Sequence, residues 1–196
     1  MLFPVLSALL SFQDDAELIQ RLKRHEPEAM GEMYDRYARA AYSLMVRMVR
    51  DSAIAEDLLQ ETFLKIWNRI DGFDEAKGLL GPWVLTVTRH RAIDYLRSTE
   101  GRVQPVSGDL EKLERPKFFL GFEADYANRE RIRVIRDVFQ KLSENQRRVV
   151  ELAYFEGLSQ SEMATRLQQP LVTMKTLART ALQALRQELS GAFSNS

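Results

Sequence analysis

The sequence contains no cysteine and only two histidines, His25 and His90, among its 196 residues. Disulfides, cysteine nucleophiles and zinc sites with cysteine ligands are therefore excluded. Neither histidine follows a glutamate by three residues, and the HExxH, GxSxG and GxxxxGKS motifs are absent as well. Asp57 and Glu61 share a helix face, but without a histidine or third acid nearby they are typical of a partner-binding or solvated face. We expect no enzyme activity, no metal, no cofactor and no small-molecule substrate.

The chain also lacks an excess of charge and an apolar run long enough for a membrane. Its 28 basic and 28 acidic residues balance, which argues against coating nucleic acid by bulk electrostatics and favours local basic faces. The apolar residues 1–12 have no basic leading segment and fall short of the about 20 residues that cross a bilayer. We predict a cytoplasmic protein. We expect segment 1–13 to be loosely ordered or packed on the core. Alternatively, it is a docking strip for a regulator or a membrane surface.

Helical periodicity and helix-capping signals are plentiful, by contrast. Asp14 followed by Glu17 predicts a capping box for a first helix. Pro27 begins a longer helix that runs to Arg50, with methionines and tyrosines at helical spacing as core residues. Asp51 then provides the N-cap of the next helix.

Two amphipathic helices fill the stretch from Asp51 to Ser98. At about 100° per residue, the first buries one stripe, formed by Ala55, Leu59, Phe63, Ile66 and Ile70. On its other side a tryptophan and a leucine lie beside a carboxylate and an amide: Asp57, Gln60, Leu64 and Trp67. This mixed face suits a protein partner. Alternatively, Leu64 and Trp67 pack on a neighbouring helix of the same domain.

The second of these helices carries an aromatic side chain among hydrogen-bond donors and cations. Pro82 fits its first helical position, and Leu85, Ala92 and Leu96 form its inward line. The opposite strip consists of Trp83, Thr86, Val87, His90 and Arg97, with Arg91 at its edge. A stacking surface beside donors and positive charge suits unpaired bases and phosphates. The alternative is a solvated basic face with a half-buried tryptophan.

Residues 99–128 lose this periodicity, and glycines and prolines punctuate them, so they are a predicted linker. A basic helix follows at 129–142. Two capping boxes then predict further helices, Ser143 with Gln146 and Ser159 with Glu162. The turn Gln-Gln-Pro leads into a last helix at 171–189, which completes helix-turn-helix spacing.

The last helix has an inward apolar face and an outward face without an acid. The inward residues are Met174, Ala178, Ala181, Leu182, Leu185 and Leu189. The outward residues are Val172, Lys175, Thr176, Arg179, Gln183 and Arg186. Such a face is long enough to read base edges in the major groove near its start and to bind phosphate further along. Alternatively, it is the solvated face of a bundle helix.

Three strings resemble the bacterial sigma factors, in particular their extracytoplasmic-function (ECF) group. AEDLLQETFLKIW and W-x-L-x-x-x-x-H-R-A-x-D-Y-L-R are similar to region two, and LSENQRRVVELAYFEGLSQSEMATRL is similar to region four. The resemblance implies an all-α fold of two small helical domains, region two at 14–98 and region four at 129–190, joined by a flexible linker and followed by a tail at 191–196.

The resemblance also implies partners and site residues. In the family, the first amphipathic helix docks on core RNA polymerase, here through Asp57, Gln60, Glu61, Phe63, Leu64 and Trp67. The second helix and the loop before it trap the non-template strand of the minus-ten element, here with Phe73, Lys77, Trp83, Thr86, Arg89, His90, Arg91 and Arg97. The recognition helix binds the minus-thirty-five element, here with Ser159, Val172, Thr173, Lys175, Thr176, Arg179 and Gln183. An anti-sigma factor is an implied inhibitor.

Two departures from the family pattern bear on DNA recognition. His90 occupies a position where many relatives have asparagine. Val172-Thr173-Met174-Lys175 stands where relatives commonly show Gly-Thr-Val-Lys, so the side chain of Val172 changes how closely the helix start approaches DNA.

The function that follows is promoter-specific initiation: the chain binds core RNA polymerase, recognises upstream duplex DNA and captures the melted strand. The main alternative is a stand-alone helix-turn-helix regulator with an N-terminal sensing or dimerisation domain. A third hypothesis is an adaptor that binds polymerase without touching DNA, which the acid-free outer face of the last helix disfavours.

Overall fold

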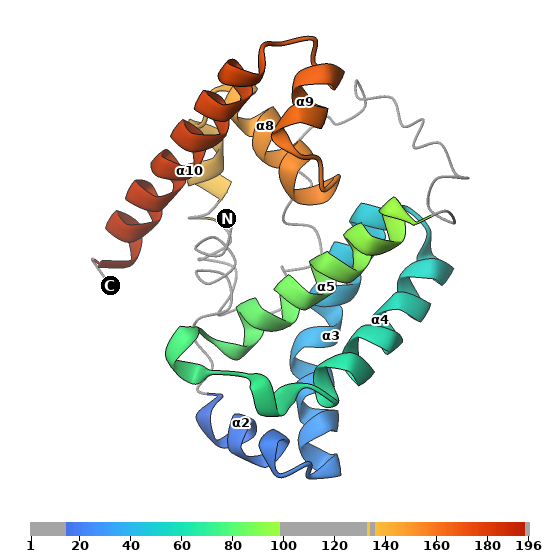
Figure 1. The fold of residues 1–196 in the computed structure, drawn as a ribbon. Coiled ribbons are helices and arrows are strands. Elements are labelled where there is room, and N and C mark those ends of the chain that lie inside the picture. The colour runs from blue at the N-terminus through green and yellow to red at the C-terminus, as the bar shows by residue number, and fades with distance from the viewer. Residues whose placement is uncertain (1–14, 99–132, 134–135, 195–196) are drawn as a thin grey trace. The chain divides into compact units, whose positions relative to one another are not determined.

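The computed structural model describes residues 15–98, 133 and 136–194 (Figure 1). Every regular element within these ranges is a helix, as the sequence predicted. Contacts divide the chain into two units, one holding the described residues 15–98 and the other those from 133 onward. We call them the front unit and the rear unit. The predicted N-terminal segment 1–13 and linker 99–128 lie outside the described residues.

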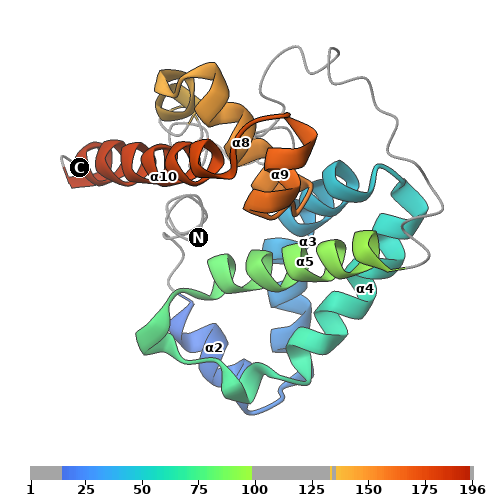
Figure 2. The same ribbon diagram turned by 45° about the horizontal axis from the view of Figure 1, so that its top comes forward.

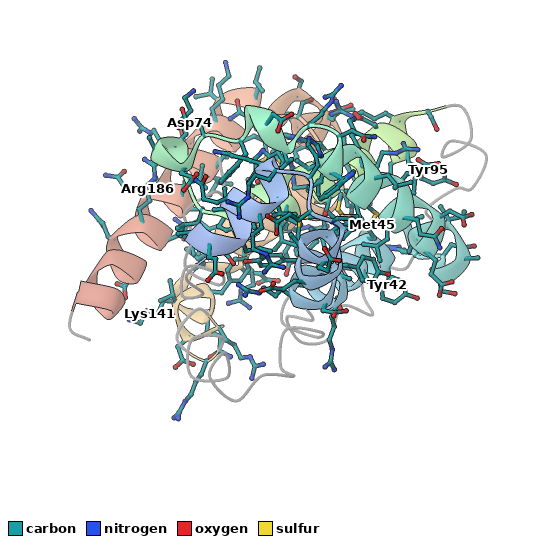
Figure 3. The ribbon with its side chains drawn as sticks, turned by 90° about the horizontal axis from the view of Figure 1, so that it is seen from below. Tyr42, Met45, Asp74, Tyr95, Lys141 and Arg186 are labelled. Atoms are coloured by element: carbon teal, nitrogen blue, oxygen red, sulfur yellow. The ribbon has the colours of Figure 1, made fainter. Side chains whose placement is uncertain are left out.

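The front unit is built around its longest helix, α3 (Pro27–Val49). Helices α2 (Ala16–Lys23), α4 (Ser52–Trp67) and α5 (Leu80–Arg97) all pack against α3 (Figures 1 and 2). Two 3-10 turns, η1 (Ile70–Gly72) and η2 (Glu75–Lys77), connect α4 to α5. The core between these helices includes Leu22, Met33, Tyr37, Met45, Phe63, Ile66, Leu80 and Leu85. Met45 is labelled within it in Figure 3.

Local capping signals set the ends of the long helices in the front unit. Pro27 occupies the start of α3, where its missing N–H costs no hydrogen bond. Arg50 ends α3 in the left-handed conformation, with φ 64°. The Asp51 carboxylate accepts a hydrogen bond of 3.0 Å from the Ile54 N–H and so caps α4. These boundaries agree with the predicted ones.

The predicted start of the first helix is wrong, because α2 has Asp15 as its N-cap residue, and the Asp15 side chain does not cap the helix. The Tyr37 hydroxyl donates to Asp15 Oδ2 at 2.5 Å, and Arg36 Nη1 donates to Asp15 Oδ1 at 2.8 Å. Asp15 is only 7% exposed, and these two charge-assisted bonds engage both oxygens of its carboxylate. Asp14 lies outside the described residues.

The rear unit consists of a helical segment at 136–141 followed by α8 (Glu144–Phe155), α9 (Gln160–Arg166) and α10 (Leu171–Ser194). Helix α10 packs against both α8 and α9 (Figure 2). Their shared core contains Val149, Leu152, Met163 and Met174. Of the predicted basic helix at 129–142, only 133 and 136–142 are described.

Both capping boxes predicted for the rear unit are present, at Ser143 for α8 and at Ser159 for α9. Gly157 lies between these two helices with φ 63°, a conformation that costs glycine little. Helix α10 continues to Ser194, past its predicted end at Leu189. Among the described helices of both units, none combines the length and the hydropathy needed to cross a bilayer.

Candidate functional site

Helix α4 presents a face of polar and apolar side chains, as helical periodicity predicted. Asp57, Gln60 and Glu61 are exposed, and Leu64 is 58% exposed, which is high for a leucine. The neighbouring helices of the front unit therefore leave more than half of Leu64 uncovered. Phe63 differs from the other predicted polymerase-binding residues because it is 1% exposed and belongs to the core.

Two aromatic contacts fix side chains beside this face. The Phe63 ring meets the Tyr34 ring of α3 edge to face, with centroids 4.9 Å apart. Trp67 is half-buried, and its ring makes a T-shaped contact of 5.0 Å with the ring of His25. His25 Nε2 in turn lies 3.3 Å from Asp71 Oδ2. For Trp67, the alternative prediction that it packs inside the front unit is therefore confirmed in part.

An ion pair joins the two front-unit faces that the sequence assigned to different partners. Arg91 of α5 donates to Glu61 Oε2 of α4 through Nη2 at 2.6 Å and through Nε at 3.1 Å. The Glu61 side chain is 60% exposed, whereas that of Arg91 is 28% exposed. The predicted polymerase-binding and DNA-binding residues are thus neighbours here.

The face of α5 is centred on Trp83. Its ring packs on the buried ring of Phe73 with centroids 5.1 Å apart and a tilt of 49°. Phe73 is only 6% exposed, so it supports the ring of Trp83 from the interior of the front unit. The Thr86 hydroxyl donates to the Pro82 carbonyl at 2.7 Å, so its proton is used within the helix. His90 and Arg97 are exposed, and Arg89 is half-buried.

Helix α5 begins earlier than its proline signal indicated. Its first residue is Leu80, so Pro82 is the third helical residue and the prediction of the first position is wrong. The first turn of a helix leaves its N–H groups unpaired in any case, which is why proline is tolerated there.

The segment before α5 is held to α2 and to itself by charge. Glu75 Oε1 accepts bonds from Lys23 Nζ at 3.0 Å and from Gln20 Nε2 at 3.3 Å. Asp74, labelled in Figure 3, accepts from the Ala76 N–H at 3.0 Å and pairs with Lys77 Nζ at 2.9 Å. The bond from Lys77 and the one from the backbone lower the pKa of the Asp74 carboxyl. The ammonium of Lys77 thus has an acidic partner here.

The rear unit presents the outward face of α10. All six residues predicted to point outward are exposed, with Val172 at 74%. Arg186 is labelled on this helix in Figure 3. Among the described carboxylates, none forms an ion pair with Lys175, Arg179 or Arg186. Thr173 is half-buried, and the Ser159 oxygen accepts a bond of 3.3 Å from the Glu162 N–H in its capping box.

Models of known protein families match both units of the chain. A family model of Sigma-70 region 2 matches residues 33–102, and one of Sigma-70 region 4 matches residues 132–185. The ECF RNA polymerase sigma factor SigK of Mycobacterium bovis is 34% identical over 170 residues, which cover 86% of this chain and 90% of SigK. The chain belongs to the ECF sigma factors.

A second SigK and one solved structure are also similar to this chain. SigK of Mycobacterium ulcerans is 31% identical over 175 residues, again covering 86% of this chain and 90% of the relative. The solved structure of Rhodobacter sphaeroides SigE in complex with the anti-sigma ChrR is 27% identical, with a TM-score of 0.47, and the match covers 89% of this chain and 97% of that one.

Membership in this family settles the class of function. A sigma factor directs transcription by RNA polymerase, and the two region matches account for both described units. The hypothesis of a stand-alone helix-turn-helix regulator is not favoured.

Three features of the ECF sigma factor escaped the sequence reasoning: the pair of Glu61 and Arg91, the contact of His25 with Trp67, and the packing of Phe73 under Trp83. Each joins residues from different elements. Helical period shows which residues share a face but not which element lies opposite. For the ion pair, the available signal was opposite charge on two adjacent helices, and several other pairs of residues satisfy that condition equally well.

Proposed function

We propose that this ECF sigma factor binds core RNA polymerase through α4, captures the non-template strand of the minus-ten element on α5, and binds the minus-thirty-five duplex through α10. The observation that carries the proposal is the outward face of α10. Its six exposed side chains include three cations and, among the described residues, no paired acid. A helix with that face suits the major groove of a polyanion.

Residues at different positions along α10 have different roles in DNA binding. Val172, Lys175 and Thr176 stand on its first two turns, where a recognition helix meets base edges. Arg179 follows on the third turn and is suited to a bidentate bond with guanine. Gln183 and Arg186 lie farther along and suit phosphate. Ser159 contributes by capping α9 and so orienting the helix pair.

On α4, the partner surface consists of exposed Asp57, Gln60, Glu61 and Leu64 and the accessible part of Trp67. An exposed leucine at the centre of polar side chains is typical of the apolar core and polar rim of a protein interface. Phe63 supports this surface from inside, because its ring is buried against Tyr34.

On α5, Trp83 is the stacking platform, and Phe73 holds it in place. Opening about ten base-pair steps costs on the order of 14 kcal/mol, at about 1.4 kcal/mol per step. Stacking one base on an aromatic side chain returns only about 1 to 3 kcal/mol. The role of Trp83 is therefore to capture a base that has already left the duplex, while polymerase supplies most of the melting energy. Thr86, Arg89, His90, Arg91 and Arg97 flank it and hold the strand, together with Lys77.

The proposal places the chain in the cytoplasm with RNA polymerase and includes an anti-sigma factor as inhibitor. The face of α4 is the natural target of such an inhibitor, because covering Leu64 would remove the polymerase contact and hide an exposed apolar side chain.

The test is initiation by purified core RNA polymerase on a template library with randomised upstream sequence. We expect the added chain to produce transcripts whose templates share an upstream motif. Arg179→Ala should weaken binding of that motif by about 1 to 3 kcal/mol. Lys141→Ala is the matched control, since Lys141 pairs with Glu188, which lies about 180° around α10 from Arg179.

Two outcomes would contradict the proposal. One is that the chain gives no transcripts above those of core polymerase alone. The other is that Arg179→Ala and Lys141→Ala weaken upstream binding equally, which would reduce the role of α10 to that of net charge.

A further inference from the structure

The most exposed of the large apolar side chains in the described residues lies on the DNA-facing side of α10. Val172 is 74% exposed, compared with 58% for Leu64 and 40% for Leu171. It is the second residue of α10. An isopropyl group can neither donate nor accept a hydrogen bond, so it cannot bind a phosphate or the polar edge of a base.

The surroundings of Val172 are those of a nucleic-acid contact. At about 100° per residue, Lys175, Thr176 and Arg179 all lie within about 60° of Val172 around the helix. All three are exposed. An apolar partner protein would have to bury these cations, whereas DNA would pair with them. The charge around Val172 therefore selects a polyanion as the occupant.

The major groove offers one apolar group that matches an isopropyl side chain. That group is the C5-methyl of thymine, because cytosine carries only a hydrogen at the same position and the other groups that distinguish the base pairs there are donors or acceptors. Packing Val172 against a donor or acceptor would leave that polar group without water or a partner. We propose that Val172 selects a thymine in the upstream duplex by contact with its C5-methyl group. This inference rests on the proposed binding of α10 in the major groove.

The test removes the methyl group alone. In the complex of the chain with core polymerase, each thymine of the selected upstream motif is replaced in turn by deoxyuridine, which keeps the hydrogen bonds of the base. We expect one replacement to weaken binding about threefold to fivefold, the loss expected for one buried methyl group. Val172→Ala should bind the thymine duplex about that much more weakly and should be indifferent to the same replacement.

Leu171→Ala is the matched control, because it shortens the neighbouring exposed apolar side chain. It should keep the full sensitivity to deoxyuridine. Equal sensitivity in Val172→Ala and the intact chain, or no sensitive thymine at all, would overturn the role of Val172. If Arg179→Ala still weakens upstream binding in that case, the proposed function of α10 stands and only this inference fails. A selection without any upstream motif would overturn both.

Discussion

The two units present their candidate residues in different ways. On α10 the outward side chains stand exposed along one face, and among the described carboxylates none pairs with its cations. On α4 and α5 the candidates are interlocked, because Glu61 pairs with Arg91 and Trp83 rests on Phe73. A substitution on the outward face of α10 should therefore change binding alone. A substitution in the front unit should change binding and packing together.

The largest expected effect separates packing from presentation on α4. Phe63→Ala removes a ring that is 1% exposed and should destabilise the front unit by about 3 to 5 kcal/mol. Leu64→Ala, one residue along and 58% exposed, should change stability by no more than about 0.5 kcal/mol. Urea unfolding followed by circular dichroism measures both. Similar losses for the two variants would contradict the assignment of Phe63 to the core.

The next effect concerns the buried polar anchor of the front unit. Burial and the hydrogen bond to Asp15 raise the pKa of the Tyr37 hydroxyl, so the folded chain keeps a proton that the unfolded chain loses above pH of about 10. The stability that Tyr37 contributes is thus complete below that pH and falls as the pH rises, by at most about 1.4 kcal/mol per pH unit.

Tyr37→Phe tests this contribution. At pH 8 the variant should be less stable by about 1.5 to 3 kcal/mol, because Asp15 loses a hydrogen-bond donor. Above pH 10 the gap between the two proteins should narrow. Urea unfolding from pH 8 to pH 11 measures it, and a gap that stays constant over that range would exclude Tyr37 as the titrating group.

A smaller effect distinguishes capping from DNA contact in the rear unit. Ser159→Ala removes the N-cap of α9 and should destabilise this unit by about 1 kcal/mol. Ser159→Asp keeps a capping oxygen and should restore the stability. Thermal unfolding of the three proteins tests the prediction, and a Ser159→Ala variant as stable as the intact chain would leave the hydroxyl without a structural role.

The smallest effect measures how tightly α4 and α5 are coupled. A double-mutant cycle with Glu61→Ala and Arg91→Ala should give a coupling energy of about 0.2 to 1 kcal/mol, since both side chains are partly exposed. High salt should reduce this coupling energy. A coupling energy of zero in low salt would mean that the ion pair does not hold the two front-unit faces together.

Most helix boundaries could be predicted because their signals are local. Pro27, the Asp51 cap and the capping boxes at Ser143 and Ser159 act on backbone groups within one turn. The outward face of α10 was equally predictable, since the 3.6-residue period alone decides which side chains share a side of a helix.

The interactions between helices could not be predicted in this way. The start of α2 differs from the predicted one, since its N-cap residue is Asp15, whose side chain binds Arg36 and Tyr37 of α3. For Phe63, periodicity indicated the core and the family resemblance indicated a partner surface. Its burial agrees with periodicity. The site residues of the front unit depend on which helix lies opposite, and that information is spread over the whole unit.

One measurement tests the division of labour between the units most directly. Leu64→Asp and Arg179→Ala chains are compared for association with core RNA polymerase and for the upstream motif selected by the resulting complex. We expect Leu64→Asp to lose polymerase binding and Arg179→Ala to bind polymerase normally but select the upstream motif more weakly. If Leu64→Asp binds core polymerase as well as the intact chain, or if Arg179→Ala selects the same motif with equal strength, the assignment of these two faces is wrong.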